Sequence, residues 1–249
     1  MRVTALFYIL IIAGINCSPR GQQAEVPKGR ISASEILRKN LMATGGLEAH
    51  KALENLVATG DFHLGSTHRM GDYKFSYKAP SNDMLQIDMI SHGTTWIGHR
   101  GEQPIKRTTV NGARMINGVS MEIVERDWRT LLEWDFCCEY SRIELIGMGD
   151  ADKRPAYALR FTPKHGDPFV CFYDRETFLL VRTDQVQRFR MNEKEREAVY
   201  KIETYFRDYR IQGAIKLPRV IAIPRTQGEL VFELSKVKPG EVISDSIFQ

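Results

Sequence analysis

Hydrophobic and polar positions alternate through most of the chain, and a period of two residues predicts β-strands. In the first half, three consecutive runs place apolar residues on one side only, and they include Phe62, Tyr73 and Leu85. Short segments rich in Gly, Pro, Ser and Asn separate the runs. The pattern predicts an antiparallel meander with one apolar face and one face toward water.

The same alternation resumes in the second half of the chain. Strands are predicted at residues 143–146, 157–161, 169–173, 178–183, 186–189, 198–209, 230–234 and 235–237, and weaker runs lie at 96–99 and 105–110. The total is about a dozen strands, which is too many for one flat sheet without curling. No period of about 20 to 50 residues repeats, so neither a propeller nor a solenoid is expected.

A helix is predicted where the folded part of the chain begins. Ser32 and Glu35 have the spacing of a capping box, and the apolar residues that follow them share one face. Gly45 and Gly46 then provide a stop signal. A short second helical turn is expected at residues 47–53.

Residues 120–136 form the one strongly helix-periodic segment in the middle of the chain. Its apolar stripe consists of Met121, Val124, Trp128, Leu131 and Leu132. Its charged residues are expected mainly on the other side; they are Glu122, Glu125, Arg126, Arg129 and Glu133. Such a helix between two runs of strands must bury its stripe against the sheet.

Two interpretations of this helix stay open. It is either a core helix that is packed permanently on the sheet or a lid over a cavity. For a lid, we expect the stripe to be only partly engaged with the sheet while the cavity is empty.

The beginning of the sequence indicates export. After Arg2, residues 5–15 are mostly apolar, which is too short for a membrane helix and suits a signal peptide over residues 1–16. Cys17 follows at once and resembles the acylated cysteine of a bacterial lipoprotein, although Asn16 departs from the small residue expected there. An ordinary secretory signal is the alternative. Residues 17–30 are polar and are expected to be a flexible tether.

Charge and cysteine content exclude several classes. The net charge of +4 is small and the charged residues are interspersed, which argues against a nucleic-acid surface. Besides Cys17, the chain has Cys137, Cys138 and Cys171. A disulfide would have to join Cys171 to one of the adjacent pair, because adjacent cysteines rarely bridge each other. We favour small buried hydrophobic residues instead.

The order of these elements resembles the LolA/LolB-type carriers that shuttle or receive bacterial lipoproteins. It is closer still to the uncharacterised lipoprotein-sorting-like proteins that share their fold. Three segments carry the resemblance: ATGGLEAHKALENL at 43–56, YDRETFLLVRTD at 173–184 and DYRIQGAIKLPRVI at 208–221. The resemblance implies an incomplete antiparallel barrel with helices over its open side, enclosing an apolar cavity for acyl chains. LolB-type receptors are lipidated, which agrees with Cys17.

We therefore predict a single, mainly β domain at residues 31–249. Its fold is an incomplete, strongly curved antiparallel β-barrel of about a dozen strands, with helices covering the open side. The residues expected to line the ligand cavity are Phe62, Leu64, Tyr73, Phe75, Tyr77, Leu85, Ile87, Trp96, Val124, Trp128, Leu131, Leu132, Leu159, Phe161, Tyr200, Ile202 and Phe206.

Catalytic signatures are missing from the sequence. It contains no G-x-S-x-G, H-E-x-x-H, P-loop or G-x-G-x-x-G motif. Its six histidines are scattered. Hairpins would bring His63 near His68, or His92 near His99, but such surface histidines are expected to be solvated. We predict no catalytic residue, no metal ion and no cofactor.

The favoured function is therefore a non-enzymatic envelope lipoprotein that faces the periplasm and binds a lipid or the acyl chain of a lipoprotein. The membrane would be reached through the lipid anchor, and a soluble periplasmic protein is the alternative location. An envelope sensor or interaction module, regulating through a protein partner, is the alternative function. A lipid hydrolase is disfavoured by the missing motifs, and an outer-membrane barrel by the helix in the middle of the chain.

Overall fold

The structure is a computed structural model that describes residues 31–66, 68–109, 115–116, 118–189 and 198–249. The predicted signal peptide, Cys17 and the tether lie outside the described residues. Residues 31–249 form one compact unit, and the description below concerns that unit alone.

Short helices precede, interrupt and follow the strands. They are α1 (Ala33–Ala43), α2 (Leu47–Lys51), α3 (Met121–Leu132), α4 (Phe136–Glu139) and the 3-10 helix η1 (Asp245–Phe248). The predicted cap of α1 is confirmed, because the Ser32 hydroxyl accepts a hydrogen bond of 3.2 Å from the backbone N–H of Glu35. After α1 the chain turns at Gly45, whose φ is +128° and where a Cβ would lie 2.4 Å from the carbonyl oxygen of Ala214. Only glycine fits this close approach.

One antiparallel sheet dominates the unit. Its strands are β1 (Asn55–Leu64), β2 (His68–Lys78), β3 (Asn82–Met89), β4 (Gly93–Arg100), β5 (Gln103–Thr108), β8 (Tyr140–Ala151), β9 (Arg154–Pro163), β10 (Phe169–Asp174), β11 (Leu180–Phe189), β12 (Ala198–Gln212), β13 (Ile215–Ile223) and β14 (Leu230–Pro239). The strand order is β5-β4-β3-β2-β1-β14-β13-β12-β11-β10-β9-β8. The pairing of β1 with β14 therefore joins the two meanders. A separate two-stranded ribbon, β6 (Met115–Ile116) with β7 (Val119–Ser120), leads into α3.

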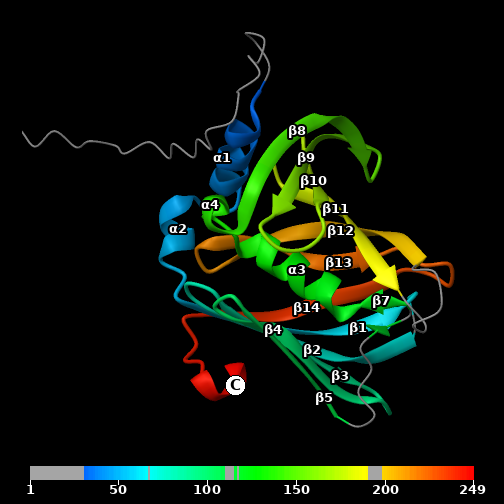
Figure 1. The fold of residues 1–249 in the computed structure, drawn as a ribbon. Helices are drawn as coiled ribbons and strands as arrows, with labels where there is room; N and C mark the ends of the chain where they lie inside the picture. The colour runs from blue at the N-terminus through cyan, green and yellow to red at the C-terminus, as the bar shows by residue number, and fades with distance from the viewer. Residues whose placement is uncertain (1–30, 67, 110–114, 117, 190–197) are drawn as a thin grey trace, which may run out of the picture. The chain divides into compact units, whose positions relative to one another are not determined.

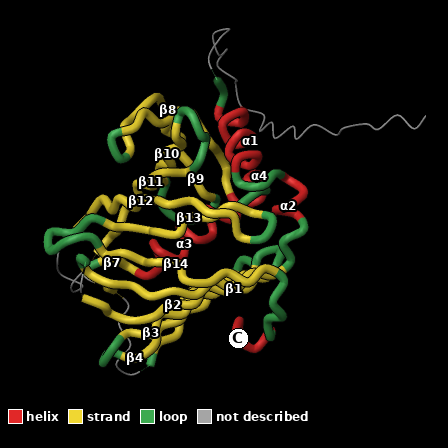
Figure 2. The backbone as a smooth tube through the Cα atoms, turned by 180° about the vertical axis from the view of Figure 1, so that it is seen from behind, coloured by secondary structure: helices red, strands yellow, loops and turns green. Residues whose placement is uncertain are grey.

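The sheet curves without closing, since its two edge strands β5 and β8 do not pair with each other. Helix α3 lies across the open, concave side (Figure 1). Seen from behind, the middle strands of the sheet lie between the viewer and α3 (Figure 2). The predicted incomplete, curved barrel with a helix over its open side is confirmed.

Apolar side chains pack on both faces of the sheet. The main core lies on the concave face, where α3 contributes its stripe to a cluster that includes Phe62, Phe75 and Phe232. A smaller cluster lies on the opposite face, where the C-terminal residues Ile243 and Phe248 cover β-strand side chains. The concave face thus receives most of the buried apolar surface.

Several predicted boundaries differ from the structure. Helix α3 ends at Leu132, because Glu133 is already extended with φ −67° and ψ 128°. The strands predicted at 178–183 and 186–189 belong to one strand, β11, which begins only at Leu180, and those at 230–234 and 235–237 are parts of β14. The loop predicted at 147–154 is instead the hairpin formed by β8 and β9, with a register shift between Leu145 and Gly147.

Candidate functional site

The N-terminal end of α3 is fixed to strand β11. The Ser120 hydroxyl caps the helix by accepting a hydrogen bond of 3.3 Å from the backbone N–H of Glu122. The side-chain amide of Gln187 in β11 binds the segment before the helix through both its oxygen and its nitrogen. It accepts from the backbone N–H of Ser120 at 2.8 Å and donates to the carbonyl oxygen of Gly118 at 3.0 Å.

The apolar stripe of α3 is fully engaged with the concave face. The indole of Trp128 is 0% exposed and stacks on Phe75, with ring centroids 5.0 Å apart and an interplanar angle of 13°. The centroid of the Tyr73 ring lies 6.2 Å from the centroid of this indole. Met121 and Val124 are equally buried. We expected the apolar stripe of α3 to contact the sheet only partly while the cavity is empty, and this expectation was wrong. The sheet is curved, so side chains from several of its strands surround the helix.

Two donors in this aromatic contact have no hydrogen-bond partner among the described residues. They are the indole Nε1 of Trp128 and the hydroxyl of Tyr73. Burying an N–H or O–H group without a partner costs free energy. The contact between α3 and the sheet is therefore tightly packed but leaves two buried polar groups without hydrogen bonds.

One flank of α3 buries a carboxyl group against β11. Asp127 accepts hydrogen bonds from the Thr183 hydroxyl at 2.7 Å and from the Gln185 amide at 2.6 Å. Burial raises the pKa of Asp127 to about 7, even though Thr183, Thr204 and Gln185 favour the charged form. Asp127 lies three residues after Val124 and four before Leu131, and this spacing on the apolar side was the sequence signal for its burial.

The other flank of α3 meets β3 and β4 through charged groups. Nδ1 of His99 lies 3.5 Å from Oδ1 of Asp83 and 3.3 Å from Oε1 of Glu125. Nε of Arg129 lies 3.7 Å from each of these two oxygens. The guanidinium of Arg129 also donates to Oε2 of Glu139 at 3.1 Å.

These contacts shift the proton affinities of the group. Burial and the neighbouring Glu125 carboxylate raise the pKa of Asp83 well above its usual value. The two carboxylates raise the pKa of His99 to about 9. For Glu125, burial opposes ionisation, but His99 and Arg129 hold its pKa below the usual range.

Two sequence predictions fail on this flank. Glu125 was expected on the outer side of the helix and is buried, and His99 was expected in water and is half-buried against the two carboxylates. The reason is again the curvature, since α3 contacts β3 and β4 on one flank and β11 on the other. A helix held on two flanks buries more than the single stripe that its apolar residues indicate.

The structure brings most of the predicted cavity residues together. Those buried in the main core are Phe62, Tyr73, Phe75, Leu85, Ile87, Val124, Trp128, Leu131, Leu132, Leu159, Phe161, Ile202 and Phe206, and Tyr77 packs against them while half-buried. Leu64 is half-buried near the end of β1. Trp96 lies on the opposite face, in the cluster with Ile247, and Tyr200 is 53% exposed at the beginning of β12.

Trp96 and Tyr200 therefore do not join the core under α3. Ile97, not Trp96, faces the core from β4, so the alternation there was assigned one residue out of step. Tyr200 is two residues before Ile202 and so shares its face of β12, but it lies beyond the end of the packed region.

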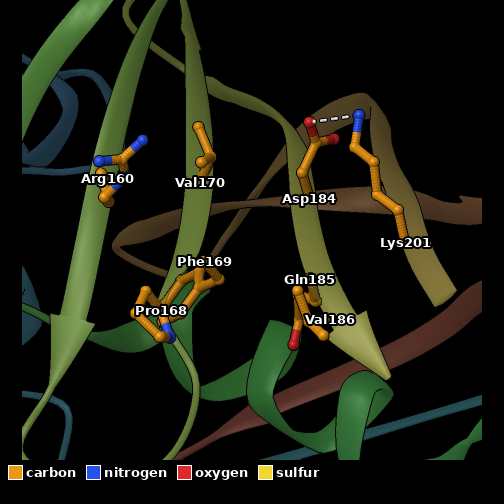
Figure 3. A pocket seen from close by; sticks show the side chains of 8 residues that line it. All are labelled: Arg160, Pro168, Phe169, Val170, Asp184, Gln185, Val186 and Lys201. Atoms are coloured by element: carbon orange, nitrogen blue, oxygen red, sulfur yellow. Dashed lines mark ion pairs between the residues drawn. The ribbon is translucent and has the colours of Figure 1, made fainter. Parts of the chain in front are cut away.

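A hollow of about 200 Å³ lies between β10 and β11. It is lined by Arg160, Pro168, Phe169, Val170, Asp184, Gln185, Val186 and Lys201. Figure 3 shows Gln185 at one end of the hollow, above α3, and the ion pair between Asp184 and Lys201 at the other. The pairing of β10 with β11 runs from Val170 opposite Asp184 onward, so the hollow lies where the two strands separate.

The remaining structural features bear on attachment and cysteine chemistry. Within the described residues, no helix has both the length and the apolar character needed to cross a membrane. Cys171 is buried with a free thiol. Burial raises its pKa well above the usual value, which makes it unreactive.

Comparison with known proteins supports the fold. No protein-family model matches the chain, and no curated protein matches its sequence. A LolA superfamily protein from Nitrosomonas europaea has a similar structure, with a TM-score of 0.55 and 15% identity, over 88% of this chain and 98% of that chain. A DUF1329 family protein from Desulfovibrio piger gives a TM-score of 0.53 and 15% identity, over 87% of this chain and 96% of that one.

A third solved structure is a putative outer membrane lipoprotein-sorting protein domain from Vibrio parahaemolyticus. It has a TM-score of 0.47 and 11% identity, over 86% of this chain and 94% of that chain. The first two structures show that residues 31–249 have a LolA-like fold, as the sequence predicted.

Proposed function

We propose that this chain, which has a LolA-like fold, is a non-enzymatic binding protein of the bacterial cell envelope. Its ligand is an apolar chain, from a lipid or from a lipoprotein, held between α3 and the concave face of the sheet. The observation that carries the proposal is the composition of the contact between them. Helix α3 covers the concave face with an apolar stripe, yet it also buries Glu125 and Asp127 there.

Burying carboxyl groups makes this contact weaker than an apolar one of the same size. Moving an ionised group out of water costs several kcal/mol unless it is well paired. The pKa of Asp127 is raised because burial makes its charged form less favourable, which is part of that cost. When α3 moves away from the sheet, Asp127 regains water, which offsets some of the lost apolar burial. Glu125 opposes this movement, because His99 and Arg129 stabilise its charged form in the closed contact. A permanent core helix would gain nothing from a residue such as Asp127.

The space that α3 would vacate suits an acyl chain. The side chains of the sheet that face Trp128 are apolar or aromatic, among them Phe75, Leu85 and Ile87. An acyl chain lying along these side chains would bury the apolar surface that the stripe of α3 otherwise covers. Such burial contributes about 25 cal/mol of free energy per Å². In this account α3 is a lid that packs fully on the sheet when no ligand is bound and exchanges places with the ligand. The aromatic contacts of Trp128 then set the free energy of opening.

Attachment to the envelope belongs to the same proposal. An acylated Cys17 would anchor the protein, and residues 17–30 would hold the domain away from the membrane while it faces the periplasm. If Cys17 is not acylated, the protein is periplasmic and soluble. The ligand site in residues 31–249 is the same in both cases.

Two measurements test the proposal. The purified protein is extracted with organic solvent, and the extract is analysed by mass spectrometry for co-purified lipids. The delipidated protein is then titrated with a fluorescent fatty-acid analogue, for which we expect saturation at one probe per chain and displacement by unlabelled fatty acid. Absence of both native lipid and saturable probe binding would contradict the proposal.

A second candidate function, binding of a protein partner, is favoured by one observation. Edge strand β8 is 12 residues long and pairs only with β9 in the described sheet. It exposes Ile146 and Met148. A long edge with exposed apolar residues suits the addition of an extended peptide as a further strand. Capture of one specific envelope protein that is lost in an Ile146→Lys variant would favour this function.

A further inference from the structure

Three potential metal-binding side chains converge beside α3. Asp83 comes from β3, His99 from β4 and Glu125 from α3. One ligand atom from each lies within 4.8 Å of the others. Asp83 and Glu125 are buried and His99 is half-buried, so these groups meet at the edge of the contact between α3 and the sheet.

The spacing of these atoms is too wide for good hydrogen bonds and suits the edges of a metal coordination sphere. Nδ1 of His99 lies 3.5 Å and 3.3 Å from the two carboxylate oxygens, whereas charge-assisted N–H···O bonds are usually about 2.7 to 2.9 Å long. In a tetrahedral zinc site, bonds of about 2.0 to 2.2 Å place neighbouring ligand atoms roughly 3.3 to 3.5 Å apart.

Carboxylate oxygen atoms without a hydrogen bond point to the same conclusion. Oδ2 of Asp83 has no hydrogen-bond partner among the described residues, and Oε1 of Glu125 has only its ion pairs with His99 and Arg129; both side chains are 4% exposed. A buried carboxylate oxygen without a donor is costly. A cation between the two carboxylates would satisfy them.

The charges around the triad leave room for a divalent ion. Asp83, Glu125 and the neighbouring Glu139 carry three negative charges when ionised, and Arg129 carries one positive charge. Arg129 reaches Glu139 with one nitrogen at 3.1 Å, its Nε lies 3.7 Å from each triad oxygen, and its third nitrogen lies 3.5 Å from Nδ1 of His99. The guanidinium thus faces all three ligand atoms from one side, and the ion would lie on the other side, with Arg129 orienting its ligands. The ion would replace the proton that the two carboxylates hold on His99.

We propose that Asp83, His99 and Glu125 bind one divalent metal ion of the zinc class. One imidazole nitrogen and two carboxylate oxygens favour Zn²⁺ or a similar transition metal over Mg²⁺ or Ca²⁺, which prefer oxygen ligands alone. Water completes the coordination, since His99 is half-buried and within reach of solvent. No sequence motif marks this site, because its ligands are distant in sequence and come from three elements.

A bound metal ion would also affect the movement of α3, a consequence that rests on the proposed function. Two of the ligands belong to the sheet and one to α3, so the ion ties the helix to β3 and β4 (Figure 1). Bound metal then holds the lid closed and slows the uptake of an apolar chain. Metal binding itself does not depend on what α3 covers.

Titration of the purified, metal-free protein with Zn²⁺ tests the proposal. We expect one tight site per chain by calorimetry, and at about 100 times the Kd a rise of roughly 5 to 10 °C in the Tm. Mg²⁺ should give no comparable rise. His99→Ala should remove the site, whereas His92→Ala, which alters an exposed histidine in the turn before β4, should keep it.

A second measurement covers the case in which His99→Ala does not fold. Co²⁺ bound by the unmodified protein should give the visible d–d bands of a low-coordination N/O site, and Zn²⁺ should abolish them at one equivalent. The proposal is overturned if the unmodified protein has no stoichiometric site, or if His99→Ala and His92→Ala respond to Zn²⁺ alike. Either result would leave the triad as a cluster of ion pairs, and it would not affect the separate lipid-binding test.

Discussion

Trp128 of α3 stacks on Phe75 of β2 at a centroid distance of 5.0 Å, and neither side chain is exposed. This contact is the centre of the packing between the helix and the sheet. Its position means that opening the concave face requires separating two fully buried rings. In the proposed lid, this contact opposes opening, and the buried carboxyl group of Asp127 favours it.

The first prediction concerns stability. Trp128→Ala should lower the free energy of unfolding by about 3 to 5 kcal/mol, because a large buried side chain is lost and a cavity remains. Trp134→Ala is the control and should cost less, since Trp134 lies after α3 and is only half-buried. Urea denaturation of both variants measures the difference. Equal, small losses would show that the stripe is not engaged as described.

The second prediction concerns pH. The pKa of Asp127 is raised from 3.8 to about 7, so the folded state holds this proton more tightly than the unfolded state. Its stabilising contribution is complete below about pH 4 and is lost as the pH rises toward 7. Asp127→Asn imitates the neutral form and should remove this loss, which amounts to about 1.4 kcal/mol per unit of pKa difference.

Urea denaturation at several pH values between about 4 and 8 provides the comparison. The unmodified protein should lose stability relative to Asp127→Asn across this range. If the two stability curves run parallel, Asp127 does not carry the shifted proton.

The third prediction concerns the two faces of β3. Ile87→Asp places a charge on the concave face, and Met84→Asp places one in the cluster on the opposite face. Both positions are almost completely buried, so we expect similar losses of several kcal/mol. Only Ile87→Asp should abolish binding of the apolar probe. The milder pair Ile87→Thr and Met84→Thr repeats the comparison if a charge prevents folding.

Thermal melting must accompany each titration, so that only folded variants are compared. Probe binding that survives in folded Ile87→Asp would place the ligand elsewhere on the domain.

The fourth prediction concerns attachment. If Cys17 is acylated, Cys17→Ala should move the protein out of the membrane fraction or leave it uncleaved, because the acyl chains provide the anchor. Fractionation followed by immunoblotting measures the distribution. The same distribution for both proteins would favour an ordinary secretory signal.

The fold could be predicted because its strands obey simple alternation. The runs that contain Tyr73 and Leu85 alternate cleanly and became β2 and β3. The prediction divided β11, because its inward positions Thr183 and Gln185 are polar and interrupt the apolar pattern. Those residues face inward to reach Asp127, a tertiary contact that no local pattern reports.

The candidate site was predictable only in its apolar part. Periodicity correctly placed Val124 and Trp128 toward the sheet. It could not bring Asp83 and His99 to Glu125, because their proximity depends on the curvature of the sheet and on the angle at which α3 crosses it. Charged residues were assigned to water by their average behaviour, which fails for a helix enclosed on two flanks.

The central claim is that α3 exchanges places with an apolar ligand, and Trp128 reports on it directly. In a variant with Trp96→Phe and Trp134→Phe, Trp128 is the only remaining tryptophan, and its emission is recorded while a long-chain fatty acid is added. Amide hydrogen exchange of residues 121–132 is followed in the same samples. The account predicts a shift of the emission on binding together with a change in exchange across α3. If lipid demonstrably binds while both signals stay constant, α3 is a permanent core helix and the central claim is wrong.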